Sequence, residues 1–158
     1  MSWSPDGRFL VYVAVNPTTA SDIMVVDRQD PTTSRPFLQT RFREGAPIFS
    51  ADGKWIAYVS DNSGRTEIYM RPFPGPGEEL TISTGGGAEP AWARNTGELF
   101  YRQGDAMMSV DVKTTPTLVV GKPRRLFERR YERIGGVFAN YDVTPDGQIG
   151  RASCRERV

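Results

Sequence analysis

The stretch PIFSADGKWIAYVSDNSGRTEIYMRPF, residues 47–73, decides the fold class of this chain. It holds three apolar runs, which end at Phe49, Val59 and Met70. Polar turns that contain glycine, at 51–53 and 61–64, separate these runs. Short runs of β-branched and aromatic residues between Gly, Asp, Asn and Ser are typical of strands joined by hairpins. The stretch therefore predicts an antiparallel meander.

The same unit recurs on both sides of this stretch. An aromatic residue before the turn and a tyrosine after it are nine residues apart in each copy: Trp3 and Tyr12, Phe49 and Tyr58, Trp92 and Tyr101. A fourth turn follows Val143. The residues before the four turns are 46, 43 and 51 positions apart, which brackets the period of propeller blades. A constant interval across a variable turn indicates a fixed register between two paired strands.

These repeats predict an all-β chain, a partial β-propeller of about three four-stranded antiparallel meander blades. We expect the blades at about 2–40, 47–84 and 91–128, with the start of the next blade at 137–147, so that the propeller fragment covers 1–147. The second strands, 9–13 and 55–59, are apolar at nearly every position instead of alternating. A strand has this composition when both faces of its sheet are covered, as they are between neighbouring blades. The aromatic residues before the turns, Trp3, Phe49 and Trp92, are accordingly expected to pack between blades.

The turns carry their own chemistry. Proline suits the second position of a turn, Asp bonds to nearby backbone N–H groups, and Gly takes the left-handed conformation that closes the hairpin. The residues expected to build the turns are Asp6, Gly7, Asp52, Gly53, Gly97, Asp146 and Gly147.

Composition excludes several classes of function. The net charge of +1 gives no general field for nucleic acid, and no run of about eighteen apolar residues could cross a bilayer. The chain has no histidine and a single cysteine, Cys154, so nucleophile pairs with His and an internal disulfide are excluded. Residues 85–87, Gly-Gly-Gly, lack the Lys of a phosphate loop and are interpreted as a crossing loop between blades. We expect no catalytic residue, no metal and no cofactor.

The last residues break the repeat. Pro145-Asp146-Gly147 should lead into an apolar strand, and none is expected in 148–158. This segment resembles the in-frame translation of a common sequencing adapter, so we interpret 148–158 as a non-native tail. A genuine basic tail is the alternative.

The motifs resemble those of a known family. Ser4-Pro5-Asp6-Gly7, Ser60-Asp61 and Glu67-Ile68-Tyr69 are similar to TolB-type, WD-like β-propeller repeats. The segments 98–102, 107–112 and 141–143 are in addition similar to the closing blades of the C-terminal sensor propeller of bacterial membrane-anchored serine/threonine kinases. The resemblance implies an extracytoplasmic, periplasmic binding or sensing module, without the kinase's own motifs. It leaves two alternatives open: a periplasmic TolB-like protein-interaction propeller, and the gating propeller of a prolyl-oligopeptidase-type serine peptidase.

Any binding surface is expected at the mouth of the central channel. The loops that cross from one blade to the next meet there, and Arg43, Glu44, Glu89 and Asn140 occupy comparable places in three of them. Such a ring of polar groups could receive a protein, a peptide or a small ligand. Its other partners would be the remaining blades of a longer chain. The same residues could also be ordinary solvated loops.

Overall fold

The computed structural model describes residues 1–130, 139 and 141–150, and these residues form strands and turns without any helix. The first sheet contains β1 (Ser2–Trp3), β2 (Phe9–Asn16), β3 (Ala20–Asp27) and β4 (Asp30–Leu38). The second contains β5 (Glu44–Phe49), β6 (Trp55–Ser60), β7 (Glu67–Pro72) and β8 (Leu80–Thr81). The third contains β9 (Ala88–Ala93), β10 (Glu98–Gln103), β11 (Ala106–Lys113), β12 (Val119–Val120) and β13 (Arg124–Glu128), and β14 (Asp142–Val143) pairs with β15 (Ile149–Gly150).

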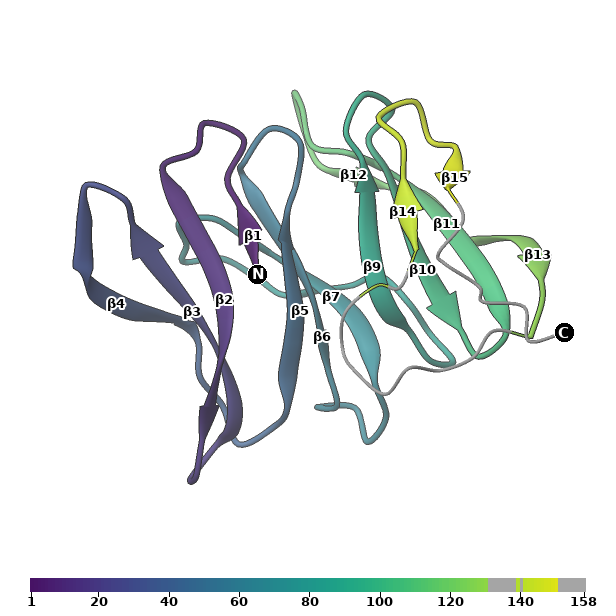
Figure 1. Cartoon of the computed structure of the whole chain (residues 1–158). Coiled ribbons are helices and arrows are strands. Elements are labelled where there is room, and N and C mark those ends of the chain that lie inside the picture. The colour runs from purple at the N-terminus through teal and green to yellow at the C-terminus, as the bar shows by residue number, and fades with distance from the viewer. Residues whose placement is uncertain (131–138, 140, 151–158) are drawn as a thin grey trace, which may run out of the picture.

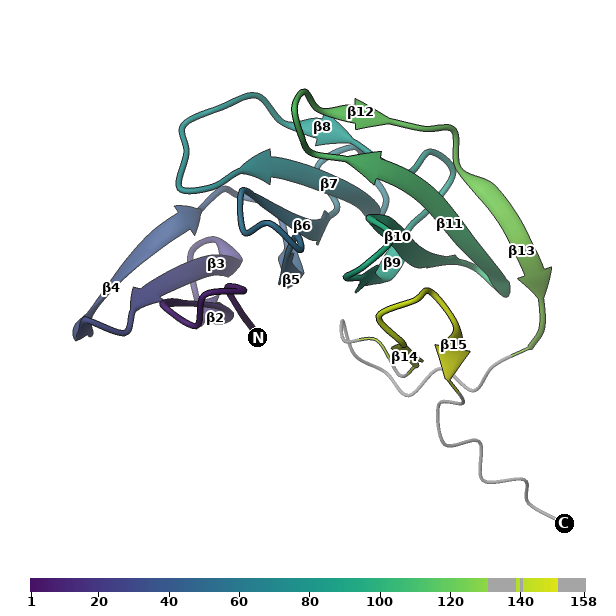
Figure 2. The same ribbon diagram turned by 90° about the horizontal axis from the view of Figure 1, so that it is seen from above.

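The sheets stand side by side in chain order (Figure 1). Viewed from above, they form an arc, with β5, β9 and β14 on its inner side and β4, β8 and β13 on its outer rim (Figure 2). All strand pairs within the sheets are antiparallel. The prediction of an all-β partial propeller with meander blades is confirmed.

The core lies between the sheets, because β6 supplies apolar side chains to both of its faces. Ile56 and Tyr58 pack with the first sheet, whereas Ala57 and Val59 pack with the third. All four are at most 3 % exposed. Burying one large apolar side chain contributes about 1.5–3 kcal/mol. The uniformly apolar composition of this strand is therefore explained by its two sheet neighbours.

The residue before each turn faces the preceding blade. Phe49 packs against the first sheet, Trp92 against the second and Val143 against the third. The register is the same in each complete blade, with Trp3 opposite Leu10, Phe49 opposite Ile56 and Trp92 opposite Leu99. The expectation that Trp3 packs between blades is wrong: its side chain is 49 % exposed. Among the described residues, no sheet covers the face on which Trp3 lies.

The hairpin turns after the inner strands gather at the upper end of the molecule (Figure 1), and the first, second and fourth of them share one hydrogen-bond pattern. In the second blade, Gly53 donates its N–H to the carbonyl of Ser50 and has φ of +70°. The hydroxyl of Ser50 donates to Asp52 and accepts the N–H of Trp55. Ser4 makes the same contacts in the first turn, and Thr144 occupies the corresponding place in the fourth. The Asp and Gly residues therefore act together with a hydroxyl that the sequence interpretation did not single out.

The third turn follows a different pattern. Gly97 has φ of +68° and donates to the carbonyl of Ala93, four residues earlier. The N–H of Asn95 donates to the carbonyl of Pro145 in the fourth turn. The Asn-Thr-Gly sequence thus connects this turn to its neighbour instead of closing on an Asp side chain.

The crossing loop at 85–87 is held by a carboxylate. Gly85 and Gly86, both at positive φ, donate their N–H groups to Oε1 of Glu67 at 2.9 and 2.8 Å. Two successive N–H groups in such a conformation form an anion-binding concavity. Here the side chain of Glu67 fills it, which supports the interpretation of a structural loop.

Several expected boundaries differ from the structure. The outer strand β4 begins at Asp30, well before the end of the expected blade at 40. In the third sheet, β13 and the short β12 both pair with β11. The segment interpreted as a tail contains a short strand near its start, in which Ile149 and Gly150 pair with Val143 and Asp142. Ile149 packs on the core between the third and fourth sheets, so the expected absence of a strand after the fourth turn is wrong at these two positions. Residues 151–158 lie outside the described residues, and the adapter interpretation of them stays a prediction.

Candidate functional site

A hollow of about 610 Å³ lies between the first and second blades, at the end of the sheets opposite the turns that follow the inner strands. Three segments converge on it: the tip of the β2–β3 hairpin, the loop that crosses to β5, and the end of β6. Ser21 in the hairpin forms an isolated parallel bridge with Arg43 in the crossing loop. The hydroxyl of Ser21 also donates to the carbonyl of Glu44 at 2.9 Å. We call this the mouth hollow; its lining residues are Val15, Asn16, Ala20, Ser21, Arg43, Glu44, Val59, Asp61 and Thr66.

Glu44 is the buried acid of the mouth hollow. The residue is 2 % exposed, and its Oε1 accepts a hydrogen bond from the hydroxyl of Thr40. Its Oε2 is buried without a hydrogen-bond partner among the described residues. Burial raises the pKa of Glu44, and the nearby carboxylates of Asp22, Asp61 and Glu79 raise it further, against the hydrogen bond from Thr40. The site therefore disfavours the ionised form of this side chain.

Asp22 is a second buried acid beside Glu44, also 2 % exposed. Its Oδ2 accepts hydrogen bonds from the side-chain amides of Asn16 and Gln39, each at 2.8 Å. Burial acts to raise the pKa of Asp22, but hydrogen bonds from surrounding polar side chains outweigh it and lower the pKa. Thr19 is one of the side chains whose hydrogen bonds lower the pKa of Asp22. Asp22 thus carries its charge at neutral pH and repels a second charge on Glu44.

Of the four residues expected at the channel mouth, the structure describes Arg43, Glu44 and Glu89. Arg43 is exposed, and both Arg43 and Glu44 line the mouth hollow. Glu89 lies in another environment, where its carboxylate pairs with Arg102 at 3.6 Å and its backbone carbonyl accepts the hydroxyl of Tyr141 at 2.6 Å. Asn140 lies outside the described residues. The structure therefore brings two of the four together.

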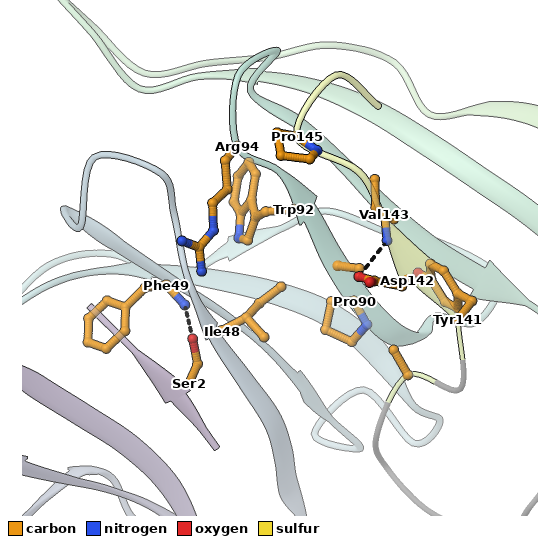
Figure 3. Close-up of a pocket in the computed structure, with 12 residues that line it drawn as sticks. Ser2, Ile48, Phe49, Pro90, Trp92, Arg94, Tyr141, Asp142, Val143 and Pro145 are labelled. Carbon is orange, nitrogen blue, oxygen red and sulfur yellow. Dashed lines mark hydrogen bonds between the residues drawn. The ribbon is translucent and has the colours of Figure 1, made fainter. Parts of the chain in front are cut away.

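A second hollow, of about 320 Å³, lies along the inner strands. Figure 3 shows its apolar wall, with Ile48, Pro90, Trp92 and Val143 around it. Arg94 also lines this axial hollow, and no hydrogen bond or ion pair joins its guanidinium to another described residue. The indole Nε1 of Trp92 is buried and lacks an acceptor in the described part of the chain. The axial hollow thus combines an apolar surface with one exposed cation, Arg94.

Sequence reasoning missed most of the lining of the mouth hollow. Asn16 and Ser21 belong to a hairpin of the first blade, and the hydrogen bond from Ser21 to Glu44 is a tertiary contact between blades, whereas Asp61 lies in the same blade as Glu44. The repeat offered one usable signal, since Asp61 follows the second strand in the motif Ser60-Asp61. Its carboxylate accepts the N–H of Arg43 at 2.9 Å and holds the crossing loop at the rim.

The described residues give no sign of metal or membrane chemistry. Among them, no group of three or more His, Cys, Asp or Glu side chains could hold a metal ion. Within the same residues, no helix is long and apolar enough to cross a membrane.

Comparison with known proteins concerns the fold. No family model matches the chain. A TolB-assigned protein from Agrobacterium tumefaciens superimposes with a TM-score of 0.72 at 20 % identity, over 94 % of this chain and 55 % of that chain. TolB from Acinetobacter baumannii gives a TM-score of 0.56 at 18 % identity, over 94 % of this chain and 48 % of that chain. Prolyl oligopeptidase B from Galerina marginata gives a TM-score of 0.53 at 11 % identity, over 90 % of this chain and 22 % of that chain.

The chain spans about half the length of the two TolB structures. At these identities the likeness shows the fold alone. Together with the sheet order and the cores between sheets, it shows that the described part of this chain has a β-propeller fold.

Proposed function

We propose that this chain is a non-catalytic binding module that receives a protein, a peptide or a small ligand at the mouth hollow. The observation that carries the proposal is the hollow itself, which is large enough for a side chain or a small molecule and is lined by Arg43, Glu44 and Asp61. Binding sites in proteins are concave, partly apolar and equipped with a few polar groups that fix orientation. Loops on a rigid scaffold commonly carry such sites.

The parent protein that we favour is a bacterial membrane-anchored serine/threonine kinase, with this module as its extracytoplasmic sensor. The support is the resemblance of segments 98–102, 107–112 and 141–143 to the closing blades of such sensors. A periplasmic TolB-like interaction propeller is the second candidate, supported by the structural likeness to two TolB proteins. The gating propeller of a prolyl-oligopeptidase-type peptidase is the third.

The gene around this chain separates these candidates. We expect a kinase domain and a membrane span encoded upstream. A signal peptide directly upstream would favour the TolB-like candidate, and a Gly-x-Ser-x-Gly hydrolase domain downstream would favour the peptidase. Amplification and sequencing of the flanking DNA from the source genome therefore decide the parent protein.

The binding role itself is tested on the isolated chain. A display library of random linear peptides is panned on the immobilised protein, and recovered peptides are titrated into ¹⁵N-labelled protein. We expect amide shifts at Ser21, Arg43 and Asp61, which line the mouth hollow. Recovery only of peptides that shift residues around the exposed Trp3, or of none, would contradict the proposal.

A further inference from the structure

The mouth hollow contains a buried acid that no cation among the described residues pairs with. Glu44 lines the hollow and is 2 % exposed, and its Oε2 is buried without a hydrogen-bond partner among the described residues. Asp22, also 2 % exposed, is a neighbouring acid outside the lining that accepts hydrogen bonds from Asn16 and Gln39. Within the same residues, no salt bridge joins either acid to a cation. A buried, unpaired carboxylate is costly, so such groups are normally paired or hydrogen-bonded.

The groups around Glu44 add to this charge. Asp22 lies on β3, Asp61 follows β6 and Glu79 precedes β8, and all three carboxylates raise the pKa of Glu44 after burial itself. Arg43 precedes Glu44 in the chain, but Arg43 is exposed, and no salt bridge joins it to the Glu44 carboxylate among the described residues. The electrostatic environment of Glu44 therefore favours a positive charge at this point.

The chemistry of the hollow favours an organic cation over a metal ion. The described residues contain no set of three or more acids, His or Cys that could ligate a metal. An ammonium group needs fewer ligands, because its three donors bind carboxylate, hydroxyl and carbonyl oxygens singly. Val15, Ala20 and Val59 give the hollow an apolar wall that suits the aliphatic stem of such a group. The volume of about 610 Å³ accommodates both parts.

We propose that the mouth hollow binds a primary ammonium group on an aliphatic stem, as in a lysine side chain of a partner peptide, with Glu44 as its counter-ion. Asp61 at the rim completes the negative surface that attracts the cation. Glu44 lines the hollow, and its Oε2, which has no hydrogen-bond partner among the described residues, is the oxygen with which the ammonium pairs. This inference rests on the proposed binding function and adds the chemical class of the ligand.

The test uses three tripeptides with the same backbone and the same aliphatic stem, titrated into the ¹⁵N-labelled chain. Acetyl-Gly-Lys-Gly-amide is the probe, and the versions with norleucine and with N-acetyl-lysine keep the stem but remove the charge. We expect saturable shifts at Ser21, Arg43 and Asp61 with the lysine peptide at pH 7.5. The neutral peptides should bind at least about tenfold more weakly, which corresponds to one lost charge pair.

Two matched variants assign the effect to Glu44. Glu44→Gln keeps the shape and removes the charge, and it should reduce lysine-peptide affinity about tenfold or more. Glu78→Gln is the same change at an exposed acid outside the hollow, and it should leave affinity unchanged. Thermal unfolding of both variants confirms that each is folded. If Glu44→Gln does not fold, Asp22→Asn provides the second measurement, with the same expected loss.

The pH profile gives an independent readout. The ammonium binds the ionised carboxylate, so affinity should fall as pH decreases through the raised pKa of Glu44. The remaining affinity of Glu44→Gln should vary less over this range. Equal binding of lysine and norleucine peptides, or unchanged affinity in Glu44→Gln, would overturn the inference. If neutral or acidic display peptides still shift the mouth residues, the binding role stands and only the cationic ligand is refuted.

Discussion

Replacement of Ser50 by alanine isolates the hydroxyl that organises the second hairpin turn. Ser50 is 1 % exposed, and its Oγ donates to Oδ1 of Asp52 at 2.6 Å while it accepts the N–H of Trp55 at 3.0 Å. Alanine removes both contacts and leaves the N–H of Trp55 without its acceptor at a part-buried position. Each hydrogen bond contributes about 1 kcal/mol net, so we expect a loss of about 2 kcal/mol in the free energy of unfolding. For a chain of this size, that corresponds to a decrease in Tm of about 4–8 °C.

The assay is urea unfolding followed by tryptophan fluorescence, with free energies from linear extrapolation. Two variants are matched controls. Ser50→Thr keeps the hydroxyl, and Thr144 makes the equivalent contacts in the fourth turn, so this variant should lose less than about 0.5 kcal/mol. Ser63→Ala removes an exposed hydroxyl that makes one long hydrogen bond of 3.2 Å, and it should also lose less than about 0.5 kcal/mol.

The relative order of these variants tests the reasoning. If Ser50→Ala and Ser63→Ala have the same midpoint and slope, the turn hydroxyl contributes nothing and the explanation of the repeat motif is wrong. If Ser50→Thr is as damaging as Ser50→Ala, the site requires a small side chain and the hydrogen bonds are not the cause.

Three further predictions concern other parts of the fold. Gly53→Ala should destabilise the chain more than Gly7→Ala, as measured by urea unfolding. Both glycines have φ near +70°, which strains alanine in each case. Of the two, only Gly53 would in addition place a Cβ 3.1 Å from Cδ of Pro5. Glu67→Gln should cost about 2 kcal/mol at pH 7. Burial acts to raise the pKa of Glu67, but its hydrogen bonds outweigh burial and lower the pKa. The stability that ionised Glu67 contributes is therefore present above its unfolded pKa and is lost as pH falls. In the variant, Tm should accordingly depend less on pH below about pH 4.5. Trp3→Ser should decrease concentration-dependent association in sedimentation velocity, because Trp3 lies on an uncovered sheet face; equal sedimentation of both proteins up to high concentration would contradict this.

The sequence predicts the blades well because both signals that it carries are local. The constant interval from Phe49 to Tyr58 reflects a register in which Phe49 lies opposite Ile56, and the apolar second strand reflects sheets on both sides. The outer strand β4 is different. Its residues from Asp30 to Pro36 are exposed, so no burial pattern marks where it begins. The position of an exposed edge strand depends on pairing with β3, which local composition does not report.

The candidate site could be predicted only in part, for a related reason. Repeat logic places Arg43 and Glu44 in a crossing loop, and the structure does the same. It cannot show that Ser21 of the neighbouring blade reaches over to bond with Glu44, since this contact depends on how one hairpin overhangs the next loop. For Trp3, the repeat logic was correct about orientation and wrong about burial, because burial needs a neighbouring sheet.

The acids of the repeat show why Glu44 differs from a structural carboxylate. Asp22 and Glu67 occupy the same register at the start of the third strand, opposite Ala14 and Ser60. Each receives donors from the end of its own blade: Gln39 donates to Asp22, and Ser83 and the loop N–H groups donate to Glu67.

In the third blade, Ala106 takes this register position, opposite Gln103, so the acid is dispensable for forming the sheet. Where the repeat does use a buried acid in this role, it supplies donors from its own blade, and those bonds lower the pKa of both Asp22 and Glu67. Glu44 follows the opposite pattern: it has one hydroxyl donor, an unpaired buried oxygen and a raised pKa. A buried charge that the fold does not satisfy, at the wall of a hollow, is better explained by a cation from outside the chain than by the stability of the blade.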